Sequence, residues 1–195
     1  SERNRANIAA AMALGETWFK VPPTIRVEYL GSLGAFVGAK DLILRLIGEI
    51  GVSGGLYKAL EFGGPVVEEL EVEGRMTMAN MAIEAGAKNG IFRADEKTIA
   101  YSEKRAKRPI KVYHADPDAE YERTIHIDAS KLEPIVSCPD LPSNTRPVSE
   151  VGDVDGRARV MGVVGVPPWG RPVWHRDLAH PQGLGALVSV LHHAH

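Results

Sequence analysis

The chain has 195 residues, 44% of them hydrophobic and 25% charged, with a formal net charge of -2 at pH 7 and a single cysteine, Cys138. This length supports one hydrophobic core, and the near-neutral charge gives no general attraction to nucleic acid or to an anionic membrane. No apolar run is long enough to span a bilayer. One cysteine excludes an internal disulfide framework and a metal site of several thiolates. We therefore expect a soluble domain of the reducing cytoplasm that binds neither nucleic acid nor membrane.

Apolar periodicity predicts helices and strands that follow one another along most of the chain. In order, the expected elements are helix 5–14, strand 24–31, helix 40–51, strand 55–65, helix 76–90, helix 95–105 and strands 110–115 and 122–128. An acidic turn is expected at residues 68–74, between the second strand and the third helix. Because strands and helices interleave, we expect an α/β fold with a mostly sequential sheet.

The helix expected at residues 76–90, MTMANMAIEAGAKNG, carries two polar residues one turn apart. Four apolar residues recur at the spacing of one buried stripe, namely Met78, Met81, Ala82 and Ala85. Asn80 and Glu84 are four residues apart, so they face the same way on another side of the helix. Composition favours Glu84 as half of an exposed i, i+4 pair with Lys88. The alternative, that Glu84 borders a site, stays open on the residues alone.

The other candidate sites have simpler explanations. His175, His180 and the closing LHHAH segment lack an acidic or thiolate partner at fixed spacing, so adventitious chelation explains them better than an evolved metal site. The basic run at residues 103–109 lies at a predicted helix end, where positive charge suits the helix dipole. It lacks the interleaved aromatic residues that stack on bases. His114 and His126 lie on predicted strands without a partner motif, so we expect surface or core positions for them.

The composition changes abruptly near residue 150. The last lysine is Lys131 and the last glutamate is Glu150, and the remainder is rich in Arg, Gly, Pro, Val, Trp and His. One interpretation is a flexible tail, which the glycine and proline content supports. The other is an out-of-frame or misjoined extension of a truncated gene, which sequencing of the coding DNA would test.

Six segments, in order along residues 15–154, carry a resemblance to one family. They are GETWFKVPPTIRV, GAKDLILRLIGEIGVSGGLYKALEFGGP, EGRMTMANMAIEAGAKNGIF, DEKTIAY, YHADPDAEYE and LEPIVSCPDLPSNTRPVSEVGDV. In order and spacing, these segments resemble the large subunits of 3-isopropylmalate dehydratases, in the aconitase superfamily. Homoaconitase large subunits share nearly all of these segments.

The resemblance implies an α/β/α three-layer domain of the aconitase iron–sulfur type at residues 20–140. Residues 1–19 would be a remnant of the preceding domain, and residues 141–195 an interdomain linker and an aberrant tail. The implied activity is that of a hydro-lyase of leucine biosynthesis, which isomerises 2- and 3-isopropylmalate by removing water and adding it back. The alternatives are a homoaconitase or aconitase fragment and a non-catalytic remnant or binding module.

The resemblance also implies a site, because the N-x-x-x-E helix of the superfamily matches Asn80 and Glu84. Glu84 would face the substrate cavity and hydrogen-bond the leaving or incoming water, and Asn80 would support the side of that cavity where a [4Fe-4S] cluster lies. The family's DSHT, GSCTNGR and CxxC segments are missing here, and Cys138 cannot supply three thiolates. We therefore expect that this chain alone holds no cluster and is inactive. The implied partners are a small hydroxy-acid substrate and the small subunit of the dehydratase, which carries the serine base.

Overall fold

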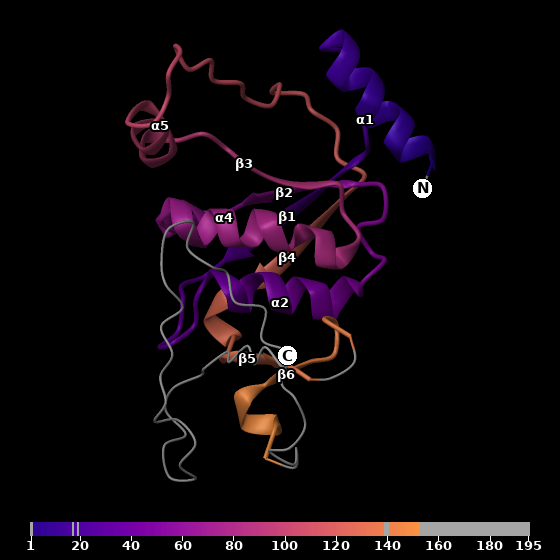
Figure 1. The fold of residues 1–195 in the computed structure, drawn as a ribbon. Helices are drawn as coiled ribbons and strands as arrows, with labels where there is room; N and C mark the ends of the chain where they lie inside the picture. The colour runs from indigo at the N-terminus through magenta and orange to yellow at the C-terminus, as the bar shows by residue number, and fades with distance from the viewer. Residues whose placement is uncertain (1, 17, 19, 139–140, 153–195) are drawn as a thin grey trace, which may run out of the picture.

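Four parallel strands form the central sheet of the computed structural model, in the order β3-β2-β1-β4 (Figure 1). The structure describes residues 2–16, 18, 20–138 and 141–152. Its helices and strands are α1 (Glu2–Leu14), β1 (Thr24–Leu30), α2 (Ala39–Ile50), β2 (Ala59–Gly63), α3 (Pro65–Glu69), α4 (Val72–Met81), β3 (Asn89–Phe92), α5 (Glu96–Glu103), β4 (Arg123–Asp128), β5 (Ile135–Ser137) and β6 (Thr145–Pro147). The short 3-10 helices are η1 (Ala82–Ala85), η2 (Ala129–Lys131) and η3 (Val148–Glu150). This parallel sheet with crossover helices confirms the predicted α/β class.

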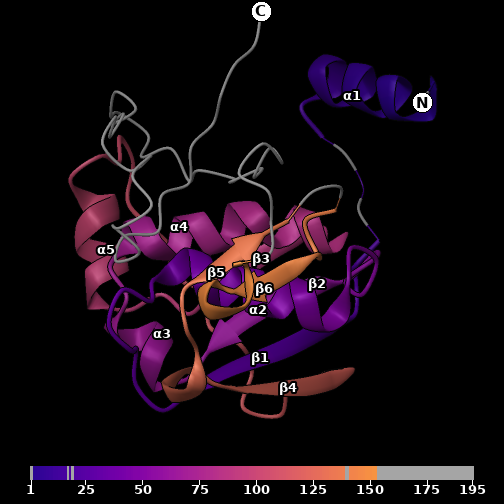
Figure 2. The same ribbon diagram turned by 90° about the horizontal axis from the view of Figure 1, so that it is seen from below.

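The core lies between the sheet and the helices α2 and α4, which run side by side over one of its faces (Figures 1 and 2). Every second side chain of β1, at Ile25, Val27 and Tyr29, is fully buried beneath these helices. Tyr29 donates its hydroxyl proton to the carbonyl of Leu42 in α2, at 2.9 Å. Burial of such alternating strand residues against an apolar helix stripe supplies the main stabilisation of the domain.

The opposite face of the sheet carries polar residues. Figure 2 shows no helix beneath β1 and β4 on this side, among the residues that the structure describes. Arg26 of β1 pairs with Glu28 and with Glu61 of β2, and Tyr121 donates its hydroxyl proton to Glu61 at 3.1 Å. Lys58 pairs with Glu122 nearby. Charged groups therefore cover this face of the sheet, whereas helices cover the other face.

Two predictions around α4 are wrong. Residues 68–74 are not a turn, because α3 ends at Glu69 and α4 begins at Val72. The predicted helix 76–90 also ends early: it changes to 3-10 geometry at Ala82 and stops at Gly86, which has a left-handed backbone with φ of 80°. Residues 89–92 then form β3, a strand that the sequence pattern did not reveal, since Asn-Gly is typical of turns.

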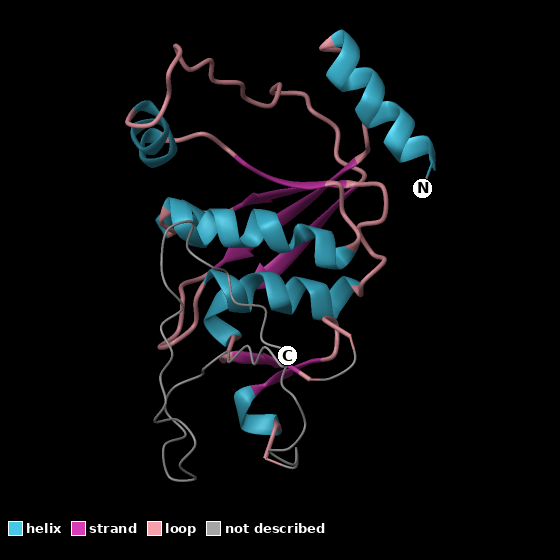
Figure 3. Cartoon of the chain, in the orientation of Figure 1, coloured by secondary structure: helices cyan, strands magenta, loops and turns pink. Residues whose placement is uncertain are grey.

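The strand predicted at residues 110–115 is also wrong. No helix or strand occurs between Glu103 and Arg123, and this connection runs from α5 to β4 as a long loop (Figure 3). The strand it leads into, β4, was predicted and pairs directly with β1. Alternation alone therefore did not decide strand formation, because residues 110–115 have no neighbouring strand and are mostly exposed.

A two-stranded antiparallel ribbon, β5 paired with β6, lies against the outer side of α2. Asp41 of α2, a buried carboxylate, accepts hydrogen bonds from the backbone N–H groups of Gly38 at 2.8 Å and Ile135 at 2.7 Å. Asp41 therefore caps α2 and also anchors the ribbon to this helix. The two strands of the ribbon lie on either side of residue 140, which is the predicted boundary between the domain and the linker. This boundary stays a prediction. Residues 153–195, with the predicted tail and its histidines, lie outside the described residues.

Helix α1 lies apart from the sheet, near the N-terminal end of the chain (Figure 1). It ends at Gly15, as predicted, with a left-handed φ of 70° at that residue. Its large apolar side chains Ile8, Met12 and Leu14 are exposed. Among the described residues, no helix combines the length and the apolar character needed to cross a membrane.

Candidate functional site

The predicted site residues lie where α4 ends, at the edge of the sheet where its strands begin. Helix α4 and η1 form one continuous helical rod that leads into β3, so the rod ends at the amino edge of the sheet. The predicted stripe of Met78, Met81, Ala82 and Ala85 is fully buried beneath it. Asn80 is exposed and Glu84 is half-buried. Both polar residues therefore lie outside the core, as their place on the helix predicts.

The change to 3-10 geometry alters the angle that is expected between Asn80 and Glu84 about the helix axis. An α-helix advances by about 100° per residue, so residues four apart point about 40° apart. A 3-10 helix advances by about 120° per residue. Since three of the four steps from Asn80 to Glu84 fall in or next to η1, the two side chains point roughly 100° apart about the axis. The structure brings both residues to the end of one helical rod, and ideal helix geometry then predicts that they point to different sides.

The i, i+4 pair of Glu84 with Lys88 is absent from the described part of the chain. Gly86 ends the helical rod between the two residues, and the Lys88 ammonium lies 4.7 Å from the centre of the Tyr57 ring. No other described residue donates a hydrogen bond to the Glu84 carboxylate or pairs with it. The explanation that composition favoured is therefore wrong, and a half-buried carboxylate is left with its acceptor positions available.

The loop at residues 52–58 holds η1 in place. Its Gly55 N–H donates to the carbonyl of Ala85 at 2.8 Å, and the Lys88 N–H donates to the carbonyl of Lys58, also at 2.8 Å. A Cβ atom on Gly55 would lie 3.1 Å from the Ala85 oxygen, and one on Gly86 would lie 2.9 Å from the Val52 oxygen. Only glycine permits so close an approach of two backbones. The position of Glu84 is therefore fixed by this loop as well as by its own helix.

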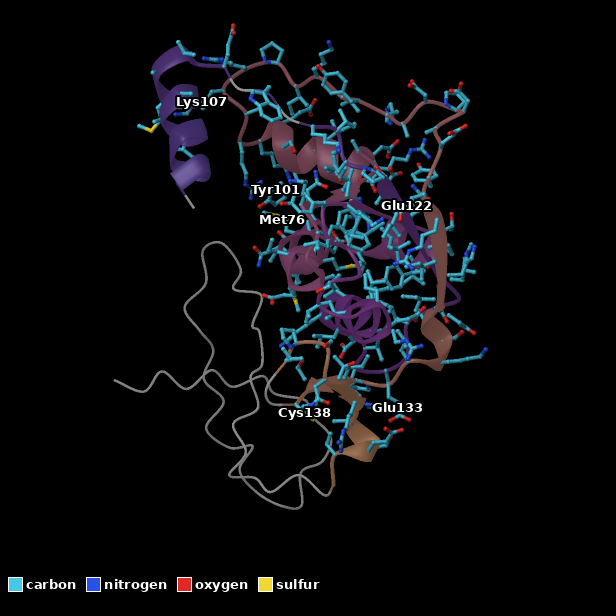
Figure 4. The ribbon with its side chains drawn as sticks, turned by 90° about the vertical axis from the view of Figure 1, so that its right-hand side faces the viewer. Met76, Tyr101, Lys107, Glu122, Glu133 and Cys138 are labelled. Carbon is cyan, nitrogen blue, oxygen red and sulfur yellow. The ribbon has the colours of Figure 1, made fainter. Side chains whose placement is uncertain are left out.

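Exposed apolar side chains surround this end of α4, and the sequence analysis missed them. They are Leu56 and Tyr57 of the loop and Ile83 of η1, with exposed fractions between 56% and 70%, while Met76, 43% exposed, lies farther along α4 towards α5. Met76 and Ile83 are seven residues apart, which is two helical turns. This spacing is the sequence signal that could have revealed an exposed apolar side of the rod. Figure 4 places Met76 below Tyr101 of α5. Apolar residues of this size, gathered outside the core, indicate a surface that contacts another group.

Tyr57 also has a left-handed backbone, with φ of 60°. A residue with a Cβ atom loses about 1–2 kcal/mol in this conformation. Such strain concentrates at functional segments of proteins. No sequence signal distinguished Tyr57, which the pattern assigned to a strand.

At the other end of α4, a buried arginine joins the helix to α5. Arg75 is only 4% exposed and forms an ion pair of 2.6 Å with Asp95. It donates further hydrogen bonds of 3.1 Å to the carbonyls of Glu68 and Leu70 and to the Thr98 hydroxyl. The hydrogen bond from Arg75, aided by those from Thr98, holds the pKa of the Asp95 carboxyl well below its usual range. This network orients α4 and so fixes the direction in which its far end points.

The [4Fe-4S] cluster implied by the resemblance does not fit the residues of this chain. Such clusters are held by cysteine thiolates, generally four of them. The chain has one cysteine, and Cys138 is buried next to the β5–β6 ribbon (Figure 4). Among the described residues, no group of three histidine, cysteine or carboxylate side chains is placed to hold a metal ion.

Comparisons with known proteins agree with the resemblance. The family model of the aconitase family (aconitate hydratase) matches residues 4–160. The chain is 58% identical over 156 residues to a protein of Heliobacterium modesticaldum, 62% over 148 residues to one of Nitratidesulfovibrio vulgaris strain Miyazaki F, and 55% over 149 residues to one of Pyrococcus furiosus. All three are named 3-isopropylmalate dehydratase large subunits, the last with the number 1.

These matches cover 76–80% of this chain but only 35–37% of each relative. The chain therefore spans about a third of the length of the relatives it matches. The matched region contains the whole described sheet and both polar residues of α4 and η1. By sequence and by fold, the chain belongs to the aconitase family.

Proposed function

We propose that the chain supplies one wall of a hydro-lyase site that interconverts 2-isopropylmalate and 3-isopropylmalate. The observation that carries this proposal is the Glu84 carboxylate, which is half-buried at the end of α4 and has no partner among the described residues. Identities of 55–62% to dehydratase large subunits support the choice of substrate. Homoaconitase and aconitase are less well supported, because the three relatives named above are isopropylmalate dehydratases.

In the proposed role, Glu84 hydrogen-bonds the water that leaves the hydroxy acid and returns at the adjacent carbon. A carboxylate accepts hydrogen bonds from that water, and the carboxylic acid donates a proton to a departing hydroxyl. Asn80, exposed one turn earlier, is proposed to support the neighbouring side of the same cavity through its amide. Because no cluster fits this chain, we assign no step to iron here.

We further propose that the complete site draws on groups beyond this chain. A small subunit, which the name of the relatives implies, would contribute the serine base, and the [4Fe-4S] cluster of the family would be held by cysteines that this chain does not contain. On this account the isolated chain is inactive. The predicted domain division, with residues 1–19 and 141–195 outside the domain, remains a proposal. So does the out-of-frame origin of the tail, which sequencing of the coding DNA tests.

A chimera tests the proposed function. Residues 4–152 replace the corresponding segment of the Heliobacterium modesticaldum large subunit, which is co-produced with its own small subunit. We expect the chimera to isomerise 2-isopropylmalate, because this segment then lies in a complete enzyme. A chimera that holds its cluster, as judged by its absorption and electron paramagnetic resonance spectra, but does not turn over isopropylmalate would refute the proposal.

A further inference from the structure

The α5–β4 connection, residues 104–122, has no role in the proposed function. It runs for 19 residues without a helix or strand. Loops of this length inside compact domains are uncommon, and they are usually functional or disordered. Figure 1 shows the connection as an arc that stands away from the sheet between α5 and β4. Its backbone therefore presents most of its side chains to the surroundings.

Charge is divided between the two halves of this connection. The basic half, defined as Lys104, Lys107, Arg108 and Lys111, is followed by the acidic half, defined as Asp116, Asp118 and Glu120. All seven side chains are exposed. Among the described residues, none of them forms an ion pair. The two halves thus lie on one exposed arc without neutralising each other.

Aromatic and apolar side chains lie between the two halves. Tyr113 is 73% exposed, with the Lys111 ammonium 4.9 Å from the centre of its ring, and Ile110 is 39% exposed. At the start of the arc, Arg105 lies over the Tyr101 ring at 3.7 Å and donates to the Tyr101 carbonyl. Arg105 is therefore already engaged, and Tyr113 marks the middle of the free part of the arc.

We propose that the α5–β4 connection is a self-association surface, on which two copies of this chain meet in antiparallel fashion about a two-fold axis near Tyr113. A two-fold interface places residue i of one copy opposite residue j of the other, and j opposite i. With the axis near Tyr113, the basic half of each copy lies opposite the acidic half of the other, and both charge contacts are attractive. The exposed Tyr113 and Ile110 side chains come together at the centre, where interfaces favour aromatic and apolar groups.

A copy of the same chain fits this surface better than a polyanion does. A nucleic acid would be attracted by the basic half but repelled by the acidic half, which lies on the same arc. The connection also lacks the series of aromatic side chains on which successive bases stack. The two halves carry complementary charge, and in the described structure they do not pair within one copy.

Sedimentation velocity on the full chain tests this proposal with two charge-reversal variants. K107E/R108E removes the net charge of the basic half, in which Lys104 and Lys111 remain, and D116K/D118K leaves Glu120 as the one acidic residue of the acidic half. We expect the unchanged chain to form dimers at about 50 mM salt and to dissociate at about 500 mM, where the Debye length falls below roughly 5 Å. Each variant alone should associate at least about tenfold more weakly. An equimolar mixture of the two variants should form dimers again, because the substituted positions of the two copies then carry opposite charges, and the unchanged acidic half of one copy lies opposite the unchanged basic half of the other.

All four substituted positions are exposed, so the variants should fold, and circular dichroism with thermal melting checks that they do. A chain that stays monomeric at low salt refutes the proposal. Dimers that neither variant weakens would place the contact elsewhere, for instance on the exposed apolar residues of α4. Variants that lose association but do not regain it on mixing exclude the antiparallel arrangement. Binding of a heparin probe that only K107E/R108E abolishes, without any dimer, would instead favour an anionic partner.

Discussion

Removal of the Arg75 side chain should lower the free energy of unfolding of the domain more than any surface substitution on its helices. In Arg75→Ala, the carbonyls of Glu68 and Leu70 lose their donors, and Asp95 loses its cation. A buried acceptor left without a donor costs about 1–3 kcal/mol. The Asp95 side chain is 35% exposed, so water screens the lost ion pair, which we count at about 1 kcal/mol or less. We therefore expect a loss of about 3 kcal/mol in the free energy of unfolding.

Urea unfolding followed by circular dichroism measures this loss, and a double-mutant cycle isolates the pair. Asp95→Ala removes the cation's partner and also the helix cap at Thr98 N, 2.9 Å away, so it should cost about 2 kcal/mol. The double variant should lose about 1 kcal/mol less than the sum of the two single variants. Arg45→Ala is the matched control, because Arg45 is half-exposed and forms only a surface pair of 3.3 Å with Glu49, worth about 0.5 kcal/mol or less.

The same pair predicts a pH dependence of known sign. The pKa of Asp95 is lowered in the folded state, chiefly by the hydrogen bond from Arg75. Its stabilising contribution is therefore complete above the unfolded pKa, about 3.9, and is lost as the pH falls through the lower folded value. Asp95→Ala should lack this loss. An Arg75→Ala variant as stable as Arg45→Ala, or single effects that are strictly additive, would refute this account of how α4 is held.

Three further substitutions test how local geometry is fixed. Asp41→Ala should lower stability by about 2–3 kcal/mol, because two backbone N–H groups lose their acceptor; faster hydrogen exchange at Ile135 checks this, and an unchanged rate there would contradict the anchoring role of Asp41. Gly86→Ala should cost about 1–2 kcal/mol in thermal unfolding, since φ is 80° and the new Cβ would lie 2.9 Å from the Val52 oxygen; a neutral result would mean that this turn is not left-handed. Phe36→Gly should raise stability by about 0.5 kcal/mol, because φ is 63° at an exposed side chain; a loss above about 1 kcal/mol would show that Phe36 has packing the structure does not contain.

The buried stripe of α4 followed from the sequence, whereas the ends of this helix did not. The burial of Met78, Met81, Ala82 and Ala85 follows from helical periodicity alone, and this periodicity is visible in the sequence. Close to the start of this helix at Val72, Arg75 pairs with Asp95, which lies 20 residues away at the N-cap of α5. The stop at Gly86 depends on close contact with the Val52 backbone. Contacts distant in sequence accompany both boundaries, whereas the sequence pattern predicted a turn at residues 68–74 and a helix that continues to residue 90.

The strands show the same division between local and distant causes. Alternation predicted β1 and β4, which pair with each other. The same alternation at residues 110–115 gave no strand, because this segment pairs with no neighbouring strand and is mostly exposed. For the site, periodicity put Glu84 outside the core but favoured a pair with Lys88, which the left-handed Gly86 prevents. Its catalytic role came from the resemblance alone, since a single carboxylate carries no signature of its chemistry.

The central claim is that the carboxylate of Glu84 acts on the water of a hydroxy-acid substrate, and Glu84→Gln in the chimera tests it most directly. This change keeps the size of the side chain but removes its ability to take up or release a proton. Glu73→Gln, at an exposed position of the same helix, is the control. With the cluster spectrum unchanged, Glu84→Gln should lower kcat for isopropylmalate by about 100-fold or more, while Glu73→Gln keeps it. If both variants turn over at the rate of the unsubstituted chimera, Glu84 has no part in the reaction.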